Sequence, residues 1–353
     1  MAANDLTTQL VEQVNTARDQ GSPLRIVGNN SKAGLAREAS GEPLNMAEHR
    51  GILDYDPREL VLTARAGTPL AEIEATLAES KQMLAFEPPH FGDATLGGTI
   101  ACGLSGPRRP FAGSARDFVL GCRLLNGKGE AMRFGGQVMK NVAGYDVSRL
   151  VTGSYGTLGV ILDVSLKVLP KPAVSATVCR ECSDSEAVQS MSALLSQPLP
   201  IDAACYSNGQ LYLRLSGSEQ GVKAALNKVA GEQLTQHTPF WTQLKEQQLS
   251  FFTRQGPLWR IVVKPATPPL GIAGEWLYDW GGAQRWLVSS EDAAHIQQQA
   301  AEAGGHATLF RGGERSGNVF HPLPTAMLAL QQRLKQSFDP AGIINPGRMY
   351  AEV

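Results

Sequence analysis

The sequence has little of what marks disulfide-stabilised, membrane-spanning or nucleic-acid-binding proteins. Its 353 residues include only five cysteines, too few for a disulfide framework in a chain of this size. No apolar run approaches the ~18 residues that span a bilayer, and the N-terminal segment lacks the basic start and apolar core of a signal peptide. The 33 acidic residues balance the 32 basic ones, so we do not expect a strongly basic, nucleic-acid-binding surface. These absences predict a soluble, cytoplasmic, globular protein.

Glycine, in contrast, is abundant and concentrated in one region. The chain has 37 glycines, and 15 of them lie between Gly92 and Gly159. Glycine destabilises regular structure, and it is used where the backbone turns sharply or approaches another group closely. This region therefore predicts backbone wrapped around a ligand.

The first half of the chain reads as short strands and helices that end at a proline-rich linker. After an amphipathic N-terminal helix, Thr68 is expected to cap a helix that has Pro69 at its first position. Asn126-Gly127 predicts a hairpin. Pro170 and Pro172 favour an extended linker, so we place a domain boundary at about residue 172. Strands are expected at 24–27, 60–66, 118–125, 130–134 and 159–169.

The second half mixes helices and strands with short connections. Ser183 and Asp184 predict the start of a helix. Further helices are expected at about 222–229, 291–303 and 325–338, and strands at 202–206, 210–215, 258–263, 285–288 and 306–310. This pattern predicts an α+β domain with an antiparallel sheet.

Three segments have residue types suited to an anionic ligand, and each has a simpler alternative. The loop at 28–32 follows a strand, and its successive N–H groups can form a nest for a phosphate, or it is an ordinary polar turn. The small side chains of 88–106 would let a flat ring or a diphosphate lie on the backbone, or they serve tight packing of a helix on a sheet. Arg108 and Arg109 suit phosphate or carboxylate recognition, or they form a solvated corner.

The order of the motifs resembles that of a flavoprotein family. The polar loop is followed by Thr-x-Gly-Gly-x-x-Ala, Gly-Ser-x-Arg-Asp, Lys-Asn-x-x-Gly-Tyr-Asp, Gly-Ser-x-Gly-x-Leu-Gly-Val-Ile and a C-terminal Phe-Asp-Pro…Asn-Pro-Gly-Arg. This order resembles the vanillyl-alcohol-oxidase, or PCMH-type, FAD-binding superfamily. Within it, EPPHFGDATLGGTIACGLSGPRRPFAGSARDFVLG, RFGGQVMKNVAGYDVSRL and FDPAGIINPGRMYAE are similar to the E subunits of bacterial glycolate oxidases (glycolate dehydrogenases). The resemblance covers almost the whole chain and is densest over 86–170 and 336–352.

The resemblance implies a fold and a set of cofactor-binding residues. A two-part FAD-binding domain would cover 1–172, an α+β cap domain 173–330, and a C-terminal helix and tail 331–353 would return to the FAD domain. The FAD pyrophosphate would be bound by the loop of Gly28, Asn29, Asn30, Ser31 and Lys32. Asp117 would order a turn, and Asn345 and Arg348 would return the C-terminus to the flavin side. The flavin and ribityl wall would comprise Pro89, Thr95, Gly97, Gly98, Ala101, Gly103, Gly106, Gly113 and Ser114, and the adenosine half would contact Gly159, Val160 and Ile161.

The resemblance also implies a function. The loop at 28–32 has no histidine or cysteine for covalent attachment, so we expect FAD to be bound noncovalently. The chain would belong to a complex that oxidises glycolate to glyoxylate and passes electrons from flavin to an iron–sulphur subunit. Its partners would be that subunit and a catalytic FAD subunit, with the complex cytoplasmic or peripheral to the inner membrane through those partners. We expect no metal site. No catalytic residue is assigned, because the hydroxy-acid-binding stretch of related D subunits is represented only by 304–313 and later His321.

Alternatives stay open at this point. One is a self-sufficient FAD-dependent 2-hydroxy acid dehydrogenase, similar to D-lactate dehydrogenases, with His306 or His321 as a candidate base. Another is a scaffold subunit that has lost FAD, although the glycine-rich wall favours a retained ligand. His90 is either a proton carrier or a structural histidine.

Two further patterns have structural explanations as well as functional ones. Cys179 and Cys182 form a C-x-x-C pair, which is either a redox or metal half-site or a chance spacing. An aromatic group in the second half is either a partner interface or core. Its members are Trp276, Tyr278, Trp280 and Trp286.

Overall fold

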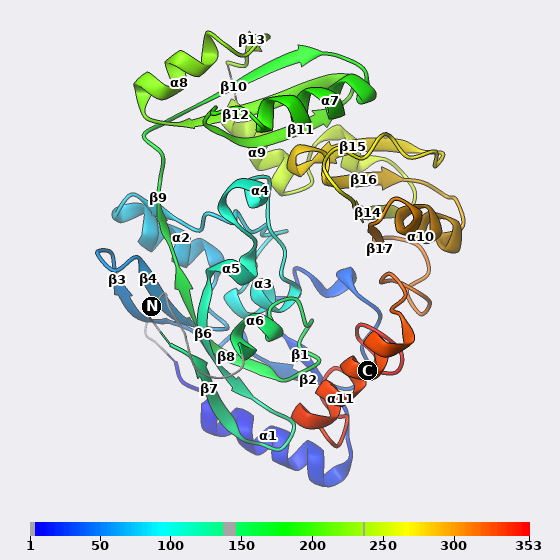
Figure 1. The fold of residues 1–353 in the computed structure, drawn as a ribbon. Coiled ribbons are helices and arrows are strands. Elements are labelled where there is room, and N and C mark those ends of the chain that lie inside the picture. The colour runs from blue at the N-terminus through cyan, green and yellow to red at the C-terminus, as the bar shows by residue number, and fades with distance from the viewer. Residues whose placement is uncertain (1–3, 137–145, 236) are drawn as a thin grey trace. The chain divides into compact units, whose positions relative to one another are not determined.

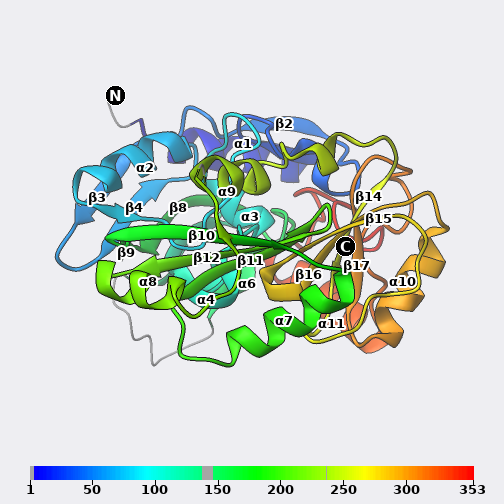
Figure 2. The ribbon, with the colours of Figure 1, turned by 90° about the horizontal axis from the view of Figure 1, so that it is seen from above.

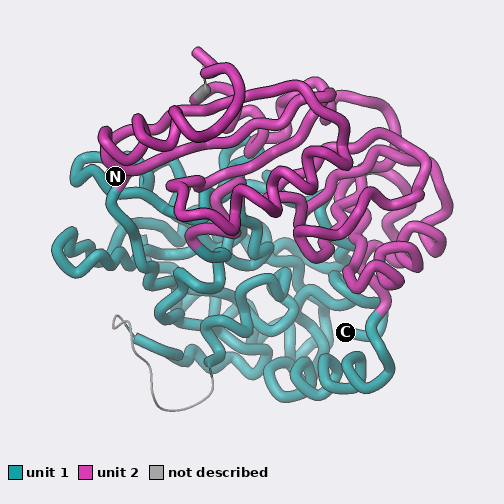
Figure 3. The backbone as a smooth tube through the Cα atoms, turned by 45° about the horizontal axis from the view of Figure 1, so that its top comes forward, with its two compact units in different colours: residues 1–105, 113–170, 323–353 teal, residues 106–112, 171–322 magenta. Residues whose placement is uncertain are grey.

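The computed structural model describes residues 4–136, 146–235 and 237–353, which form two compact units (Figures 1 and 3). Unit 1 comprises Met1–Ser105, Gly113–Pro170 and Leu323–Val353, and unit 2 comprises Gly106–Ala112 and Lys171–Pro322. The short segment Gly106–Ala112 thus leaves unit 1 and belongs to unit 2. The functional domains expected at 1–172, 173–330 and 331–353 stay predictions.

Unit 1 is built on a five-stranded antiparallel sheet of order β3-β4-β8-β6-β7. The central strand β8 is buried from Val160 to Leu166, which explains its nearly continuous apolar sequence. Its Ser165 forms a hydroxyl–hydroxyl hydrogen bond of 2.8 Å with Thr63 of the neighbouring strand. The strands are β3 (Ile52–Asp56), β4 (Val61–Arg65), β6 (Val119–Leu125), β7 (Ala131–Gly135) and β8 (Val160–Lys167).

Two small strand pairs complete the β structure described in unit 1. β1 (Leu24–Val27) pairs in parallel with β2 (Glu42–Asn45). β5 (Gln82–Met83) pairs with β9 (Leu169–Pro170). The predicted hairpin is confirmed as β6–β7. Its loop has five residues, 126–130, one more than the predicted strands allowed. Within it the Asn126 side chain accepts hydrogen bonds from the N–H groups of Lys128 and Glu130, both at 3.0 Å.

Helices of unit 1 pack on its five-stranded sheet and on β5. The predicted N-terminal helix is confirmed as α1, which buries Leu10, Val14 and Ala17. The expected cap at Thr68 is wrong: α2 begins at Leu70 after Pro69, and the Thr68 hydroxyl instead accepts a hydrogen bond of 2.9 Å from the N–H of Gly51. The helices are α1 (Thr7–Gln20), α2 (Leu70–Glu79), α3 (Leu96–Cys102), α5 (Ala115–Phe118), α6 (Val147–Val151), α11 (Thr325–Phe338) and the 3₁₀ helix η1 (Ala33–Leu35).

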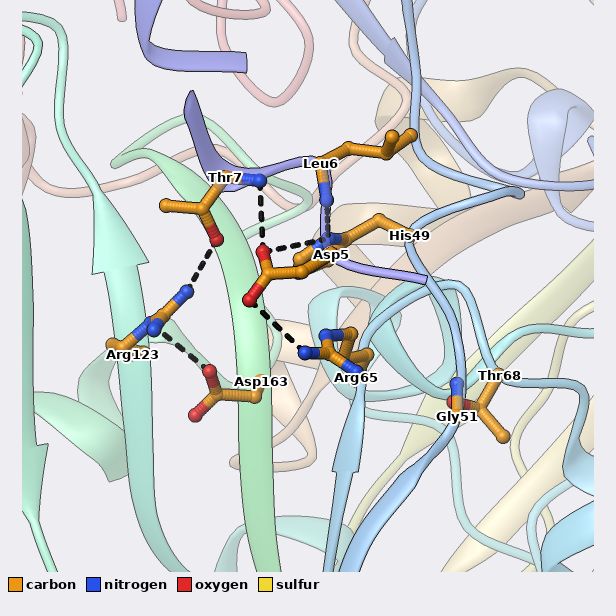
Figure 4. Close-up of polar contacts among 9 residues, drawn as sticks. All are labelled: Asp5, Leu6, Thr7, His49, Gly51, Arg65, Thr68, Arg123 and Asp163. Atoms are coloured by element: carbon orange, nitrogen blue, oxygen red, sulfur yellow. Dashed lines mark hydrogen bonds and ion pairs between the residues drawn. The ribbon is translucent and has the colours of Figure 1, made fainter. Parts of the chain in front are cut away.

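A polar network fixes the segment before α1 to the end of β4 and to His49, which precedes β3 (Figure 4). Asp5 accepts hydrogen bonds from the Thr7 N–H at 2.9 Å and from Arg65 at 3.0 Å. The N–H of Leu6 donates to Nδ1 of His49 at 3.0 Å. His49 is fully buried, and burial lowers the pKa of its ring below the usual 6.5. His49 is therefore neutral, as its role of acceptor requires.

Unit 2 is built on an eight-stranded antiparallel sheet of order β13-β10-β12-β11-β15-β16-β14-β17, which confirms the predicted α+β class. Figure 2 shows β10, β12 and β11 running side by side. The strands are β10 (Val174–Glu181), β11 (Ile201–Ser207), β12 (Gln210–Gly217), β13 (Glu232–Gln233), β14 (Leu258–Val262), β15 (Glu275–Asp279), β16 (Gln284–Val288) and β17 (His306–Arg311).

Two apolar clusters hold the helices of unit 2 on this sheet. In one, Met191 of α7 and Val222 of α8 pack with Leu213 of β12. In the other, Ile296 of α10 packs with Ile261 of β14. The predicted helix start at Ser183 is confirmed, because its hydroxyl and the Glu186 side chain form a capping box. The helices are α4 (Arg109–Ala112), α7 (Asp184–Leu195), α8 (Glu219–Leu226), α9 (His237–Lys245), α10 (Ala293–Glu302) and the 3₁₀ helices η2 (Ser250–Thr253) and η3 (Trp280–Gly282).

The structure places the members of the cysteine and aromatic patterns. Cys179 lies on β10 and Cys182 one residue beyond its end, and both are free thiols. The aromatic group is largely core: Trp276 is half-buried, whereas three members are buried, namely Tyr278, Trp280 and Trp286.

Candidate cofactor-binding site

A cavity of about 400 Å³ lies in unit 1, within the size range of small-molecule sites. Four segments that are distant in sequence line it: the loop after β1, the helix α3, the turn at 155–159 and the C-terminal tail. The sequence-predicted residues that line it are Gly28, Asn29, Asn30, Ser31, Lys32, Thr95, Gly97, Gly98, Ala101, Gly159, Ile161, Asn345 and Arg348.

The loop after β1 presents backbone donors to the cavity. Within the described chain, no hydrogen bond is donated by the backbone N–H groups of Gly28, Asn29, Asn30 or Ser31. Asn30 has a φ of 59°, a left-handed conformation that curves the loop. A run of N–H groups on a curved loop forms an anion-binding nest. The loop therefore suits the negatively charged pyrophosphate of a dinucleotide.

The helix α3 supplies a wall of low side-chain volume. Thr95 caps this helix, since its hydroxyl accepts a hydrogen bond of 3.3 Å from the N–H of Gly98. A Cβ at Gly97 would lie 2.7 Å from the Cβ of Ala66, and a Cβ at Gly28 would lie 2.6 Å from Oγ1 of Thr95. At these positions the backbone reaches its neighbours at a distance that glycine alone permits.

The C-terminal tail is fixed to the cavity through one asparagine. The Asn345 side chain accepts a hydrogen bond from the N–H of Ile26 and donates one to the carbonyl of Tyr155, each at 2.8 Å. Asn345 thereby joins the tail to β1 and to the turn at 155–159. Arg348 donates hydrogen bonds to the carbonyls of Arg37 and Ala33, which hold it beside the loop after β1.

A buried ion pair between Lys335 of α11 and Asp339 also fixes the C-terminal tail. Nζ of Lys335 lies 2.8 Å from the Asp339 carboxylate, and it donates to the carbonyls of Thr157 and Ile344 at 2.9 and 2.5 Å. The Asp339 carboxylate accepts hydrogen bonds from the N–H groups of Ile343 and Ile344. No sequence motif indicated a buried role for Lys335, because a lysine in an amphipathic helix usually lies in solvent.

Positive charge predominates among the cavity-lining side chains. The lining includes three cationic residues, Arg25, Lys32 and Arg348, and one carboxylate, that of Glu38. Lys32 is buried, and its Nζ donates to the carbonyl of His90 at 3.2 Å. A dinucleotide pyrophosphate carries negative charge, so the charge of these residues fits the pyrophosphate of FAD.

Several sequence-predicted residues lie outside the cavity lining. Gly103 ends α3 with a φ of 62°. The Ser114 N–H and hydroxyl both donate to Asp117, at 2.8 and 2.7 Å, so Asp117 orders the turn at α5. Val160 packs in the core. The predicted residues that do not line the cavity are Pro89, Gly103, Gly106, Gly113, Ser114, Asp117 and Val160, and the motif residues 140–145 lie outside the described chain.

Some lining residues were not predicted individually. They are Arg25, Ile26, Val27, Ala33, Glu38, Ala39, Met46, Ala66, Cys102, Tyr155 and Gly156. Tyr155 and Gly156 lie inside the motif Gly-Ser-x-Gly-x-Leu-Gly-Val-Ile, and this motif is the sequence feature that indicates them. Glu38, Ala39 and Met46 have no sequence signal, because folding of the chain between β1 and β2 brings them to the cavity. His90 does not line it and lies 3.1 Å from the Glu74 carboxylate.

Comparison with known proteins identifies the family. Residues 5–135 match the family described as FAD binding domain. The chain is 52% identical over 350 residues to glycolate oxidase subunit GlcE of Escherichia coli, with 99% of both proteins covered. It is 24% identical over 390 residues to glycolate oxidase subunit GlcD of Bacillus subtilis, covering 92% of this chain and 83% of that protein. A D-2-hydroxyglutarate dehydrogenase of Xanthomonas citri pv. viticola is 30% identical over 149 residues, covering 42% of this chain and 32% of that protein.

A solved structure supports the fold. An alkyldihydroxyacetonephosphate synthase superposes with a TM-score of 0.66 at 16% identity, covering 97% of this chain and 76% of the other. The predicted PCMH-type fold and the predicted FAD cofactor are thus confirmed. This chain belongs to the family of FAD-dependent oxidoreductases that contains glycolate oxidase subunit GlcE.

Proposed function

We propose that this chain binds one FAD in the cavity of unit 1 and takes part in the oxidation of glycolate to glyoxylate. Bound FAD supplies a hydride acceptor. Glycolate loses a hydride from its carbon and a proton from its hydroxyl, which together leave the aldehyde of glyoxylate. The observation that carries the proposal is the cavity itself, in which a donor-rich loop, a glycine wall and three cationic side chains meet.

The roles of the lining residues follow from their geometry. The N–H groups at 28–31 would bind the pyrophosphate, and Lys32 and Arg348 would balance its charge. Thr95, Gly97, Gly98 and Ala101 would let the cofactor lie against α3, and Gly159 and Ile161 would line the remaining wall. Predicted residues beyond the lining, such as Gly103 and Asp117, would shape the backbone that carries these contacts.

The cofactor would be held without a covalent bond. No histidine lines the cavity in the described chain, and its one described thiol is that of Cys102. Burial raises the pKa of the Cys102 thiol to about 11. The thiol is therefore protonated at neutral pH and is a poor nucleophile toward the flavin.

The chain would act as one subunit of a complex. Two relatives are named as different subunits of glycolate oxidase. We propose a catalytic FAD subunit and an iron–sulphur subunit as partners, with the latter taking electrons from the flavin. Among the described residues, no helix has both the length and the apolar character that crossing a membrane requires. We place the complex in the cytoplasm, in contact with the inner membrane through its partners.

The experiment that tests this function compares complexes that contain either the wild-type chain or the Gly28→Ala variant. Glycolate is added anaerobically, and flavin absorbance is followed. We expect less bound FAD and less bleaching per complex with the variant. Equal flavin content and equal bleaching in both complexes would contradict a flavin role for this chain. Bleaching of the wild-type chain purified alone would instead identify it as a self-sufficient dehydrogenase.

A further inference from the structure

Unit 2 carries a group of basic side chains on one face of its sheet. Arg260 of β14 lies opposite Thr308 of β17, and Val262 lies opposite His306. Because alternate residues share a face, Arg260 and His306 are diagonal neighbours on the same face. Ile261, which has the opposite orientation, packs with α10 in the core. The face with Arg260 and His306 is therefore the one turned away from α10.

An aromatic ring brings a second arginine to this group. The guanidinium carbon of Arg109 lies 4.3 Å from the ring centre of Trp280, and that of Arg260 lies 5.9 Å from it. The indole N–H of Trp280 donates to the carbonyl of Gly106 at 2.9 Å. Trp280 has a φ of 54°, an uncommon conformation for a bulky residue. Such strain persists where the surrounding structure fixes it, and here it belongs to a ring that lies within 6 Å of two guanidinium carbons.

Arg109 is held in place by its own short segment. The preceding residue, Arg108, forms an ion pair of 2.5 Å with Asp202 of β11. Phe111 packs against the apolar cluster around α7 and α8. Two anchors within the segment Gly106–Ala112 therefore position Arg109 over Trp280. A guanidinium group stacks on a ring through its flat face, whereas its N–H groups point outward in its plane. An arginine stacked on a ring can therefore still bind a carboxylate at its edge.

The electrostatics of the group favour an anion. Desolvation, followed by the positive charges of Arg260, His321 and Arg109, lowers the pKa of His306 to about 4, and no carboxylate is among these causes. The Nδ1 atom of His321 accepts a hydrogen bond of 3.4 Å from the N–H of Ala307. The nearby carboxylate of Asp279 accepts hydrogen bonds from the N–H of Trp280 and from Gln284. At neutral pH, His306 is thus an uncharged imidazole beside two cations.

We propose that Arg109, Arg260 and His306 form a binding site for a small 2-hydroxy carboxylate. The two guanidinium groups bind the carboxylate, and the neutral imidazole of His306 accepts a hydrogen bond from the hydroxyl. This inference rests on the proposed function, in which glycolate is the substrate, and it assigns the residues that recognise that substrate class. The sequence alone did not indicate which residues bind the hydroxy acid. The two arginines proposed here lie about 150 residues apart in the chain, so no local motif contains both.

The test is anaerobic isothermal titration of the full chain, reconstituted with FAD, with three probes. Glycolate has both groups, glycolamide replaces the carboxylate with a neutral amide, and acetate lacks the hydroxyl. We expect glycolate to bind more tightly than either of the other two. We expect Arg109→Gln and Arg260→Gln to weaken glycolate binding by at least about tenfold, the loss typical of a charge-assisted hydrogen bond. His306→Leu should remove the difference between glycolate and acetate.

A matched control uses another stacked arginine of unit 2. Arg254 lies 5.3 Å from the ring centre of Phe251 and pairs with Glu275, so Arg254→Gln should bind glycolate as the wild type does. Arg260→Lys keeps the charge and should retain part of the binding if Arg260→Gln fails to fold. Equal affinity for glycolate and glycolamide in the wild type would overturn the inference. Flavin absorbance of the same samples separates the two proposals, because a chain with FAD but no glycolate binding refutes only the site in unit 2.

Discussion

The loop after β1 approaches Thr95 so closely that Gly28 leaves no room for a side chain. A methyl group there would lie 2.6 Å from the Thr95 hydroxyl, which caps α3. Gly28→Ala should therefore displace the loop or the cap, at a typical overpacking cost of about 1–3 kcal/mol, and reduce FAD affinity. Flavin absorbance per chain after reconstitution measures the effect. Gly34→Ala is the control, because a Cβ at Gly34 meets nothing within 4 Å; equal FAD content in the two variants would contradict this geometry.

His49 links the stability of unit 1 to pH. Its folded pKa lies below the usual 6.5, since burial disfavours the charged ring. As the pH falls through about 6.5, the unfolded chain takes up this proton before the folded chain does. The free energy of unfolding should therefore decrease as the pH falls below 6.5. Above pH 6.5, His49 should not contribute to the pH dependence of stability.

Replacing His49 isolates its contribution. In His49→Asn, the pH dependence of the free energy of unfolding between pH 7 and 5 should be shallower by up to about 1.4 kcal/mol per pH unit, the value for one proton. Denaturant titrations at several pH values measure this slope. The other histidines are the same in both proteins, so identical slopes would show that His49 takes up its proton equally in both states.

At the scale of single elements, sequence signals predicted those helices and strands whose local preferences agree with the fold. Ser183 and Glu186 form a capping box, and α7 begins where they indicate. A helix within 88–106 was predicted only as an alternative, because the two glycines among the seven residues of α3 disfavour a helix. Its cap at Thr95 and its contact with Ala66 provide the tertiary support that overrides this preference.

Among the residues of the cofactor-binding site and its supports, too, some were predicted from the sequence and others depend on contacts between distant segments. The loop at 28–32 and the C-terminal Asn345 and Arg348 were predicted from motifs, and the structure places them at one cavity. The exchange of Gly106–Ala112 into unit 2 and the buried pair of Lys335 and Asp339 were not predicted. Both depend on contacts between segments far apart in the chain, which no local pattern encodes.

The C-terminal segment depends on Lys335. Lys335→Met would leave the Asp339 carboxylate buried without its cation, which typically destabilises a protein by about 3–5 kcal/mol. We expect a lower midpoint in urea denaturation and, because Asn345 and Arg348 follow Asp339, weaker FAD binding. Arg333→Met changes an exposed cation of the same helix and serves as the control. A Lys335→Met protein that unfolds at the wild-type urea concentration would show that the ion pair does not stabilise the tail.

At the scale of the whole molecule, each unit has its own sheet and its own chemistry. Unit 1 has the cavity that fits FAD, and unit 2 has the arginine–tryptophan–histidine group that we assign to the 2-hydroxy carboxylate. Identity of 52% over nearly the full length to a glycolate oxidase subunit shows that both units belong to one family architecture. The proposed oxidation of glycolate therefore depends first on the FAD of unit 1.

The most direct measurement is the visible absorption spectrum of the purified chain after incubation with FAD and removal of unbound cofactor, followed by acid denaturation. The account predicts flavin bands for one FAD per chain and complete release of that FAD into the supernatant, because the Cys102 thiol in the cavity has a pKa of about 11 and does not attack the flavin. A colourless chain would contradict FAD binding. Flavin that stays with the precipitated protein would contradict noncovalent attachment.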